Sequence, residues 1–448
     1  MSQMTVSVAP QGSAMLWRSL RILLGLGLWV VAVFGMGVLF YRLSQGLGIT
    51  RLGSTVPWGL WVAFYIYFIG LSAGSFLLSS LVFVFGNKNL EPLSRLAVLQ
   101  AFVCLLLGLV FIFLDMGHWE RFYYVLIYPQ WHSVLTWEIW FYNAYIIVLL
   151  LELWMLMRCD LSRWSSRVRG LWGRLYGLLA LGFKCPTTAV EKEDCERRTA
   201  KWLKFLGIIG IPIALGVHGG TGAIFAVVKA RPAWYSPIFP LVFIVSALAS
   251  GGGLLLFLRV FVAPEPQKDR QILPGVANLV AGFLIFDVLL LFLEFLVGIY
   301  GGVPDHVEPY RLMTHGPFAW VFWGQQLLLG VAIPLLLLYA RPRVSRYKVQ
   351  EIGIAGLLIF VGIFGVRLNI VIPALAVPVL RGFDTVMESP RFSSLYVPNW
   401  IEWMSSLGVI ALGILITYWL MHRLPMLEHQ ELPKAGHIEF ATQTSTTP

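Results

Sequence analysis

Charged side chains are scarce in this sequence. Lys, Arg, Asp and Glu make up 12% of its 448 residues, whereas hydrophobic residues make up 58%. Soluble domains carry roughly a quarter charged residues, so these figures exclude an ordinary water-soluble fold. The charge is also unbalanced, with 33 Lys and Arg against 23 Asp and Glu. Because membrane proteins concentrate Lys and Arg in cytoplasmic loops, we attribute the excess to topology and expect no nucleic-acid partner.

Cysteine is rare as well, with four residues in the chain. Cys185 and Cys195 share a loop, but they lack a companion histidine and their spacing does not fit a zinc or iron–sulfur site. We therefore expect inert thiols and no metal. A b-type haem held by two histidines needs two of them inside the membrane. His218 is the single intramembrane histidine that the sequence offers, so no haem is expected in this chain.

Long apolar runs are the dominant feature that is present. A membrane-spanning helix needs about 20 apolar residues, and ten segments meet this requirement, which predicts an all-α polytopic membrane protein. We expect a tail at 1–19, a transmembrane domain at 20–423 with an inner loop at 158–204, and a polar, disordered tail at 424–448. The ten predicted spans are Leu20–Tyr41, Pro57–Phe85, Leu93–Leu114, Val134–Met157, Phe205–Val228, Pro237–Val262, Leu273–Tyr300, Phe318–Tyr339, Ile352–Ile372 and Trp400–Met421.

The distribution of basic residues predicts the orientation. With the N-terminus inside, 24 of the 33 Lys and Arg lie in inner segments, eight lie in outer loops, and Arg367 lies within a span. Basic residues are enriched on the cytoplasmic side. Both termini are therefore expected in the cytoplasm.

Ionisable side chains recur at a similar depth in several predicted spans. Asp115 and Glu138 lie at outer span ends, on either side of an aromatic connection that also contains His118 and Trp137. The outer parts of other spans contribute His218, Glu294, Arg367 and Glu402. Ionisable groups in a membrane are costly and usually functional, so their common level indicates one site near the outer face.

Each of these residues also has a structural explanation. His218 is either hydrogen-bonded within a helix bundle or a group that exchanges protons. Arg367 either pairs with a buried carboxylate or polarises a ligand, and Glu138 and Glu402 could extend toward the interface. Gly219 and Gly220 beside His218 would let another backbone or a flat ring approach closely. The residues alone leave these alternatives open.

Eight short stretches resemble the NrfD/PsrC family of quinone-reacting membrane subunits, with the HybB and DsrP branches nearest. They occur in order along most of the spans, and the set is more specific than any one member. The stretches are PWGLWVAF (57–64), LDMGHWERF (114–122), SVLTWE (133–138), VHGGTG (217–222), ARPAWYSP (230–237), LEFLVGIY (293–300), VRLNIVIP (366–373) and YVPNWIEW (396–403).

This resemblance implies two four-helix bundles with flanking helices, and no haem in the chain. It implies a quinone or menaquinone substrate near the outer face and electron exchange with a ferredoxin-like iron–sulfur partner. It also implies the cytoplasmic membrane of a prokaryotic cell. The motif positions carried over fall on Asp115, Glu138, His218, Glu294, Arg367 and Glu402, and of these we expect His218, Asp115 and Glu138 to exchange protons. The chain would then be the quinone-reactive subunit of a larger oxidoreductase, not catalytic alone. Two other classes remain open from the sequence, a secondary transporter and a purely structural membrane anchor.

The orientation is testable with reporter fusions at Lys192 and Tyr128. Because these positions lie in predicted inner and outer segments, a fusion at Lys192 should report the cytoplasm and one at Tyr128 the opposite side. Alkaline phosphatase and a fluorescent protein provide the two readouts. The same compartment for both fusions would contradict the topology.

Overall fold

The computed structural model describes residues 11–86, 91–263, 270–339, 349–379, 382 and 389–425. Within these ranges every regular element is a helix, and ten helices are long and apolar enough to cross a membrane. The predicted all-α polytopic fold is therefore confirmed. Residues 1–10 and 426–448 of the two predicted tails lie outside the described residues.

The ten spans follow the predicted order. They are α1 (Gln11–Gln45), α2 (Leu60–Phe83), α3 (Glu91–Asp115), α5 (Val134–Arg167), α7 (Ala189–Ala226), α8 (Phe239–Phe257) with the π-helix η4 (Leu258–Val262), α9 (Leu273–Tyr300), the π-helix η6 (Val321–Ala332) with α11 (Ile333–Tyr339), α12 (Val349–Ala376) and α14 (Trp400–Arg423). The short helices are η1 (Leu47–Ile49), η3 (Trp119–Arg121), α4 (Tyr124–Ile127), α6 (Leu171–Leu179), α10 (Pro304–His315) and η7 (Pro390–Phe392).

The predicted inner loop at 158–204 is largely helical. Helix α5 continues to Arg167, α6 follows, and α7 begins at Ala189. The start of α7 is fixed by Thr188, whose side chain accepts a hydrogen bond from the Glu191 N–H. Such an N-cap, followed by charged helix-forming residues, extends a helix into water beyond the apolar segment. Hydropathy marks the apolar part of such a helix but not its soluble extension.

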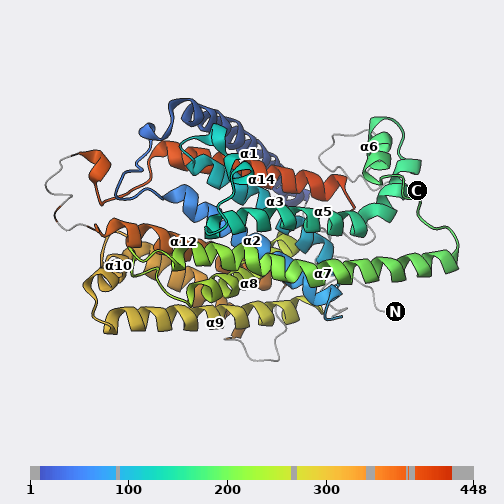
Figure 1. Cartoon of the computed structure of the whole chain (residues 1–448). Coiled ribbons are helices and arrows are strands. Elements are labelled where there is room, and N and C mark those ends of the chain that lie inside the picture. The colour runs from blue at the N-terminus through green and yellow to red at the C-terminus, as the bar shows by residue number, and fades with distance from the viewer. Residues whose placement is uncertain are drawn as a thin grey trace.

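The spans form two bundles with a flanking pair. Helices α2, α3, α5 and α7 pack together, and α8, α9, η6–α11 and α12 form the second group. Helices α1 and α14 pack on each other outside the first bundle, while α2 and α8 join the two bundles. Figure 1 shows the long helices running side by side, with α10 and α6 at opposite ends. We refer to these as the α10 end and the α6 end.

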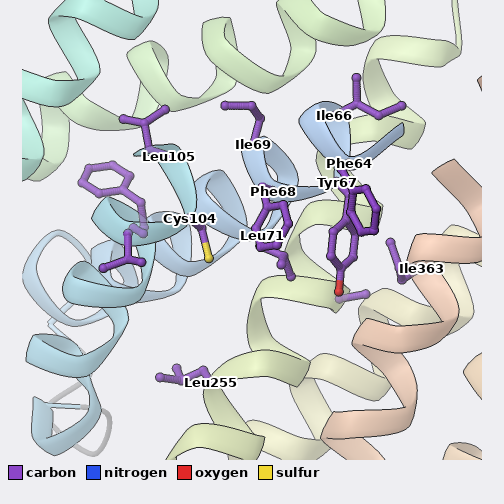
Figure 2. Packing of buried hydrophobic residues seen from close by; sticks show 14 of the residues in the cluster. Phe64, Ile66, Tyr67, Phe68, Ile69, Leu71, Cys104, Leu105, Leu255 and Ile363 are labelled. Carbon is purple, nitrogen blue, oxygen red and sulfur yellow. The ribbon is translucent and has the colours of Figure 1, made fainter. Parts of the chain in front are cut away.

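Helix α2 lies at the centre, and nearly all of its side chains are buried. The Phe64 ring stacks on Phe111 of α3 and on Phe364 of α12, with centroid distances of 4.8 and 4.3 Å. Figure 2 shows further α2 side chains between Cys104 of α3 and Ile363 of α12. Since lipid tails are as apolar as these side chains, close packing rather than exclusion of water stabilises this arrangement.

Small residues bring α2 and α8 into backbone contact. Gly74 faces the Ala247 carbonyl, and a Cβ atom on Gly251 would lie 2.6 Å from the Ser75 nitrogen. Gln100 of α3 donates to the Gly251 carbonyl at 2.9 Å, which adds a polar contact at the same crossing. Small residues and interhelical hydrogen bonds are the usual means of joining helices in a membrane.

One sequence expectation about the cysteines is wrong. Cys159 and Cys185 form a disulfide, with their Cα atoms 4.9 Å apart, whereas Cys104 and Cys195 are free thiols. The segment after α6 folds back onto the end of α5, a proximity that sequence spacing did not reveal. The charge bias predicts that this end lies in the cytoplasm, where disulfides are rare. The two observations favour opposite orientations, which the reporter fusions distinguish.

Substitution of Gly251 by Ala should destabilise the protein. The added methyl group would meet backbone atoms of α2, and overpacking of this kind costs about 1–3 kcal/mol. Gly282→Ala is the matched control, because Gly282 lies in a helix with no neighbouring atom within 4 Å of its Cβ position. Thermal unfolding in detergent should give a lower Tm for Gly251→Ala alone, and equal Tm values would contradict the packing argument.

Candidate functional site

A buried charge cluster connects α1, α3 and α14. Arg42 is fully buried, donates from Nη2 to the Met116 carbonyl at 2.8 Å, and has its guanidinium 5.2 Å from the centre of the Trp61 ring. Asp115 interacts electrostatically with Arg42 and with Glu402, and its Oδ1 has no hydrogen-bond partner. Two carboxylates therefore lie near one buried cation at the α10 end.

The Glu402 carboxylate is held by groups of this chain. Its Oε1 accepts from the Tyr396 hydroxyl at 2.5 Å, and its Oε2 accepts from the N–H groups of Asn399 and Arg51 at 3.0 and 3.2 Å. Tyr396 also accepts from the Leu60 N–H at 2.9 Å. Burial, and then the Glu402 charge, raise the pKa of Tyr396 far above its usual value, so this hydroxyl stays protonated. These contacts cap α14 and fix the adjoining loops.

Glu138 lies in a network between α2, α5 and α7. It is 1% exposed, and its Oε1 accepts hydrogen bonds from the hydroxyls of Tyr142, at 2.7 Å, and Thr221. The hydroxyls of Tyr142 and Tyr65 are 2.6 Å apart. The Oε2 atom of Glu138 has no partner. Tyr142 follows Glu138 by four residues, which places both side chains on one face of α5.

Arg367 joins α12 to His218 and Ser246. Its Nη2 is 3.3 Å from Nε2 of His218, donates to the Ser246 hydroxyl, and belongs to a guanidinium 4.4 Å from the centre of the Phe243 ring. Because an arginine only donates, Nε2 of His218 must be the acceptor in this contact, which requires a neutral imidazole. Gly70 leaves room for the pair, since a Cβ there would lie 3.0 Å from the imidazole.

A cavity of about 340 Å³ lies in the second bundle, next to this pair. It is bounded by α9, α10, η6 and α12 and by the segment that leads into α8. The wall is mainly apolar and aromatic, and Phe292 and Trp323 on it are 55% and 56% exposed. The cavity therefore reaches the lipid-facing surface. Its polar wall residues are Asp287, Glu294, Gln326 and Asn369.

The end of the cavity is built by loop residues that bind the terminus of α12. Pro378 has no N–H to donate to the Ala374 carbonyl, which instead accepts from Arg231 at 3.1 Å. Trp234 donates from Nε1 to the Ile370 carbonyl at 2.6 Å, and its ring lines the cavity. Pro378 thus leaves the Ala374 carbonyl free to accept from Arg231, in the loop that forms this end of the cavity.

The opposite side of the cavity depends on the contact between η6 and α12. A Cβ on Gly330 would lie 2.6 Å from the Cα of Gly362, so the two backbones touch. Asn369 donates from Nδ2 to Oε1 of Gln326 at 2.9 Å, which fixes both amides on the wall. The wider π-helical turns of η6 are of the kind often found at functional sites.

The residues selected from sequence fall into separate places. Glu294 lines the cavity and accepts from Ser236 at 3.0 Å. His218 and Arg367 contact each other beside it, and Thr221, on the same helix as His218, donates to Glu138; we call His218, Arg367, Thr221 and Glu138 the polar layer. Asp115 and Glu402 belong to the Arg42 cluster. His118 is exposed and 2.9 Å from Glu120, and Trp137 is half exposed. Gly219 packs on Ile244, while Gly220 has open space beside it. The described structure therefore does not unite these residues around one cavity.

Three cavity residues were not selected from sequence, namely Asp287, Gln326 and Asn369. Asp287 is 1% exposed and interacts electrostatically with Arg367. A carboxylate in the middle of an apolar span is itself a signal of function, so Asp287 could have been chosen. The side chains of Gln326 and Asn369 carry no charge, and no sequence pattern indicates that they face the cavity. Among the described side chains, no three His, Cys, Asp or Glu residues gather as a metal-binding group.

Comparison with known proteins identifies the family. The family model described as "Polysulphide reductase, NrfD" matches residues 48–379. The chain belongs to the NrfD family. It is 39% identical to the C subunit of selenate reductase from Mesobacillus selenatarsenatis, over 90% of this chain and 93% of that protein. The resemblance seen in the sequence is thus confirmed.

The chain is also similar, at lower identity, to membrane subunits of other redox complexes. The chain is 29% identical to the Hdr-like menaquinol oxidoreductase integral membrane subunit of Archaeoglobus fulgidus, over 86% of this chain and 89% of the relative. It is 25% identical to the C component of polysulfide reductase from Wolinella succinogenes, over 73% and 97%. The chain is therefore similar, over most of its length, to membrane subunits of several reductase complexes.

Proposed function

We propose that this protein is the quinone-reactive membrane subunit of a respiratory reductase complex. It would bind quinone or quinol, menaquinone being the expected type, and exchange electrons with an iron–sulfur subunit. The family, the ten spans and the names of the relatives support a membrane subunit of a redox complex. The cavity in the second bundle is the observation that carries the assignment to a quinoid ligand.

The size and chemistry of the cavity suit such a ligand. Ligand pockets usually hold a few hundred cubic ångströms and combine apolar walls with a few polar groups. Here the aromatic and aliphatic wall suits a flat ring, and Asp287 and Glu294 can meet its oxygen atoms. The exposed side chains Phe292 and Trp323 border an opening toward lipid, through which an isoprenoid tail can extend.

The polar layer beside the cavity suits proton transfer. Asp287 interacts electrostatically with Arg367, and Arg367 contacts His218. Thr221, which donates to Glu138, lies three residues after His218 on α7. Carboxylates and histidine are the usual groups that exchange protons with a reacting ligand. We therefore assign His218 and Glu138 to proton exchange between the ring and the outer face, with Arg367 between them and the cavity.

We place the exit of electrons to a partner subunit at the α10 end. The connection between α3 and α5 at this end carries exposed aromatic side chains at Tyr123, Tyr124 and Trp131. Aromatic residues are enriched in protein interfaces. We assign this surface to an iron–sulfur partner. The aromatic segment 381–398 is the other outer loop that we assign to this docking surface, and it lies partly outside the described residues.

Filling the cavity should strongly reduce quinone-linked activity. Ile363 is 3% exposed and lines the cavity, so the larger side chain of Ile363→Trp would occupy the space of the ring. Quinol-dependent turnover of the assembled complex should fall roughly tenfold or more, which corresponds to about 1.4 kcal/mol. Turnover with an artificial donor that reduces the partner directly should be unchanged.

Ile354→Trp is the matched control for this substitution. Ile354 lies on the same helix and is 41% exposed, so the added ring would point away from the cavity. Its turnover should equal that of the unmodified protein. Equal quinol turnover in Ile363→Trp and Ile354→Trp complexes would reject the cavity as the quinone site.

Substitution in the polar layer should affect turnover more than binding. His218 and Glu138 do not line the cavity, so His218→Ala and Glu138→Gln should leave the KM for quinol nearly unchanged. His218→Ala removes a buried imidazole and Glu138→Gln removes a carboxyl group that can carry a proton. A loss on the order of 1.4 kcal/mol in either variant corresponds to a roughly tenfold lower kcat. Steady-state kinetics of assembled complexes provide the measurement. An unchanged kcat in both variants would exclude them from proton exchange.

A further inference from the structure

Helix α6 turns one face toward the protein and the opposite face outward. Gly173 and Tyr176, three residues apart, are buried. Leu171 and Leu178 are 80% and 69% exposed, and Leu181, just beyond the helix, is 72% exposed. Because residues seven apart lie on the same side of a helix, Leu171 and Leu178 point in one direction. We call Leu171, Leu178 and Leu181 the leucine patch.

The contacts of α6 place it at the level where the span α14 ends. The Tyr176 hydroxyl donates to the carbonyl of Arg423, the last residue of α14, at 3.0 Å. The Trp172 ring lies 6.1 Å from the ring of Trp419 and 4.8 Å from the Arg423 guanidinium. Tryptophan is enriched at the boundary between the hydrocarbon region and water. We therefore infer that α6 lies along this boundary, at the end of the bundle where Figure 1 shows it.

The segment after α6 is attached to α5, which holds α6 in this place. Cys185 is joined to Cys159 of α5 by the disulfide, and its N–H donates to the Ser162 hydroxyl at 3.2 Å. The Arg158 guanidinium lies 4.3 Å from the centre of the Phe183 ring. Helix α6 is therefore held on α5 from both of its ends, and the leucine patch is a fixed part of the surface.

The segment that carries the leucine patch is also strongly basic. Residues 161–187 contain five Lys and Arg and no Asp or Glu, whereas residues 189–204 contain five Lys and Arg and four Asp and Glu. Exposed leucines beside exposed cations are typical of helices that lie on anionic membranes. The basic side chains of the first segment are all exposed, and they are Arg163, Arg167, Arg169, Arg174 and Lys184.

We propose that α6 is an interfacial helix that binds anionic phospholipids of the adjoining leaflet. The leucine patch enters the lipid, because apolar surface exposed to water costs free energy that burial recovers. Arg169 and Arg174 keep their aliphatic stems along the lipid while their guanidinium groups reach the headgroup phosphates. The occupant is lipid, because α6 packs on Trp419, which is itself 47% exposed on a membrane span. This surface is independent of the cavity and of the quinone-linked function.

The test measures lipid contact at position 178 in the assembled complex. A fluorescent amino acid is incorporated in place of Leu178, and the complex is reconstituted in phosphatidylcholine vesicles. The vesicles contain the same fraction of nitroxide-labelled phosphatidylglycerol or of nitroxide-labelled phosphatidylcholine. Both lipids should quench the fluorescence, and the anionic lipid should quench it roughly twofold more strongly because the basic segment attracts it.

The matched control for position is Val190. Its side chain is apolar and 78% exposed, but it lies on the first turn of α7, in the part of that helix that extends into water. The same fluorescent amino acid in place of Val190 should be quenched by neither lipid.

Charge variants separate electrostatic binding from apolar contact. Arg169→Gln combined with Arg174→Gln removes two cations of the basic segment, so the two lipids should then quench position 178 equally. A salt concentration of 1 M, at which the screening length falls to about 3 Å, should have the same effect. Lys192→Gln combined with Arg197→Gln is the matched control, because it removes two exposed cations from the mixed-charge start of α7. This variant should retain the preference for the anionic lipid.

Each outcome decides the proposal. Stronger quenching by phosphatidylglycerol that is lost in the Arg169 and Arg174 variant and kept in the Lys192 and Arg197 variant supports it. Equal quenching by both lipids in the unmodified charge background would reject the binding of anionic headgroups. Absence of quenching at position 178 would show that water or another subunit of the complex covers the leucine patch, and would overturn the interfacial role of α6.

Discussion

The buried cation of Arg367 is the constraint on which the arrangement of the two bundles depends. A guanidinium in the hydrocarbon region is costly unless protein groups replace its hydration. Here those groups are His218 of α7, Ser246 and Phe243 of α8, and the electrostatic contribution of Asp287 on α9. Nε and Nη1 still have no partner. If any of these helices moved, the Arg367 guanidinium would lose one of these contacts. Arg367 therefore couples the first bundle to the cavity of the second.

The fold followed from sequence more completely than the site did. Hydropathy identified all ten spans because each must bury its backbone polar groups in a helix about as long as the membrane is thick. The soluble extensions of α5 and α7 were missed because they are polar. The disulfide was missed because the pairing of Cys159 with Cys185 depends on how the segment after α6 folds back, which no local pattern encodes.

For the site, the position of each residue along its helix was predictable, but its rotation about the helix axis was not. Asp115 interacts electrostatically with Glu402, yet Glu402 is held by its own capping network, and Glu138 faces Tyr142 and Thr221. Which groups share a cavity depends on crossings such as that of Gly330 with Gly362, where the absence of a side chain decides the contact. A purely structural anchor has no need for a void that weakens packing, and this favours a ligand.

Because η6 is a π-helix, the shape of the cavity depends on the number of residues in this segment. Each π turn holds an additional residue relative to an α turn, so the register of Gln326 against Asn369 is set by how many residues lie between Val321 and Ala332. Loss of a single residue there would rotate everything beyond it by about 100° around the helix axis. Insertions and deletions in this segment are therefore changes, in addition to substitutions on the wall, by which relatives could gain, lose or reshape this cavity.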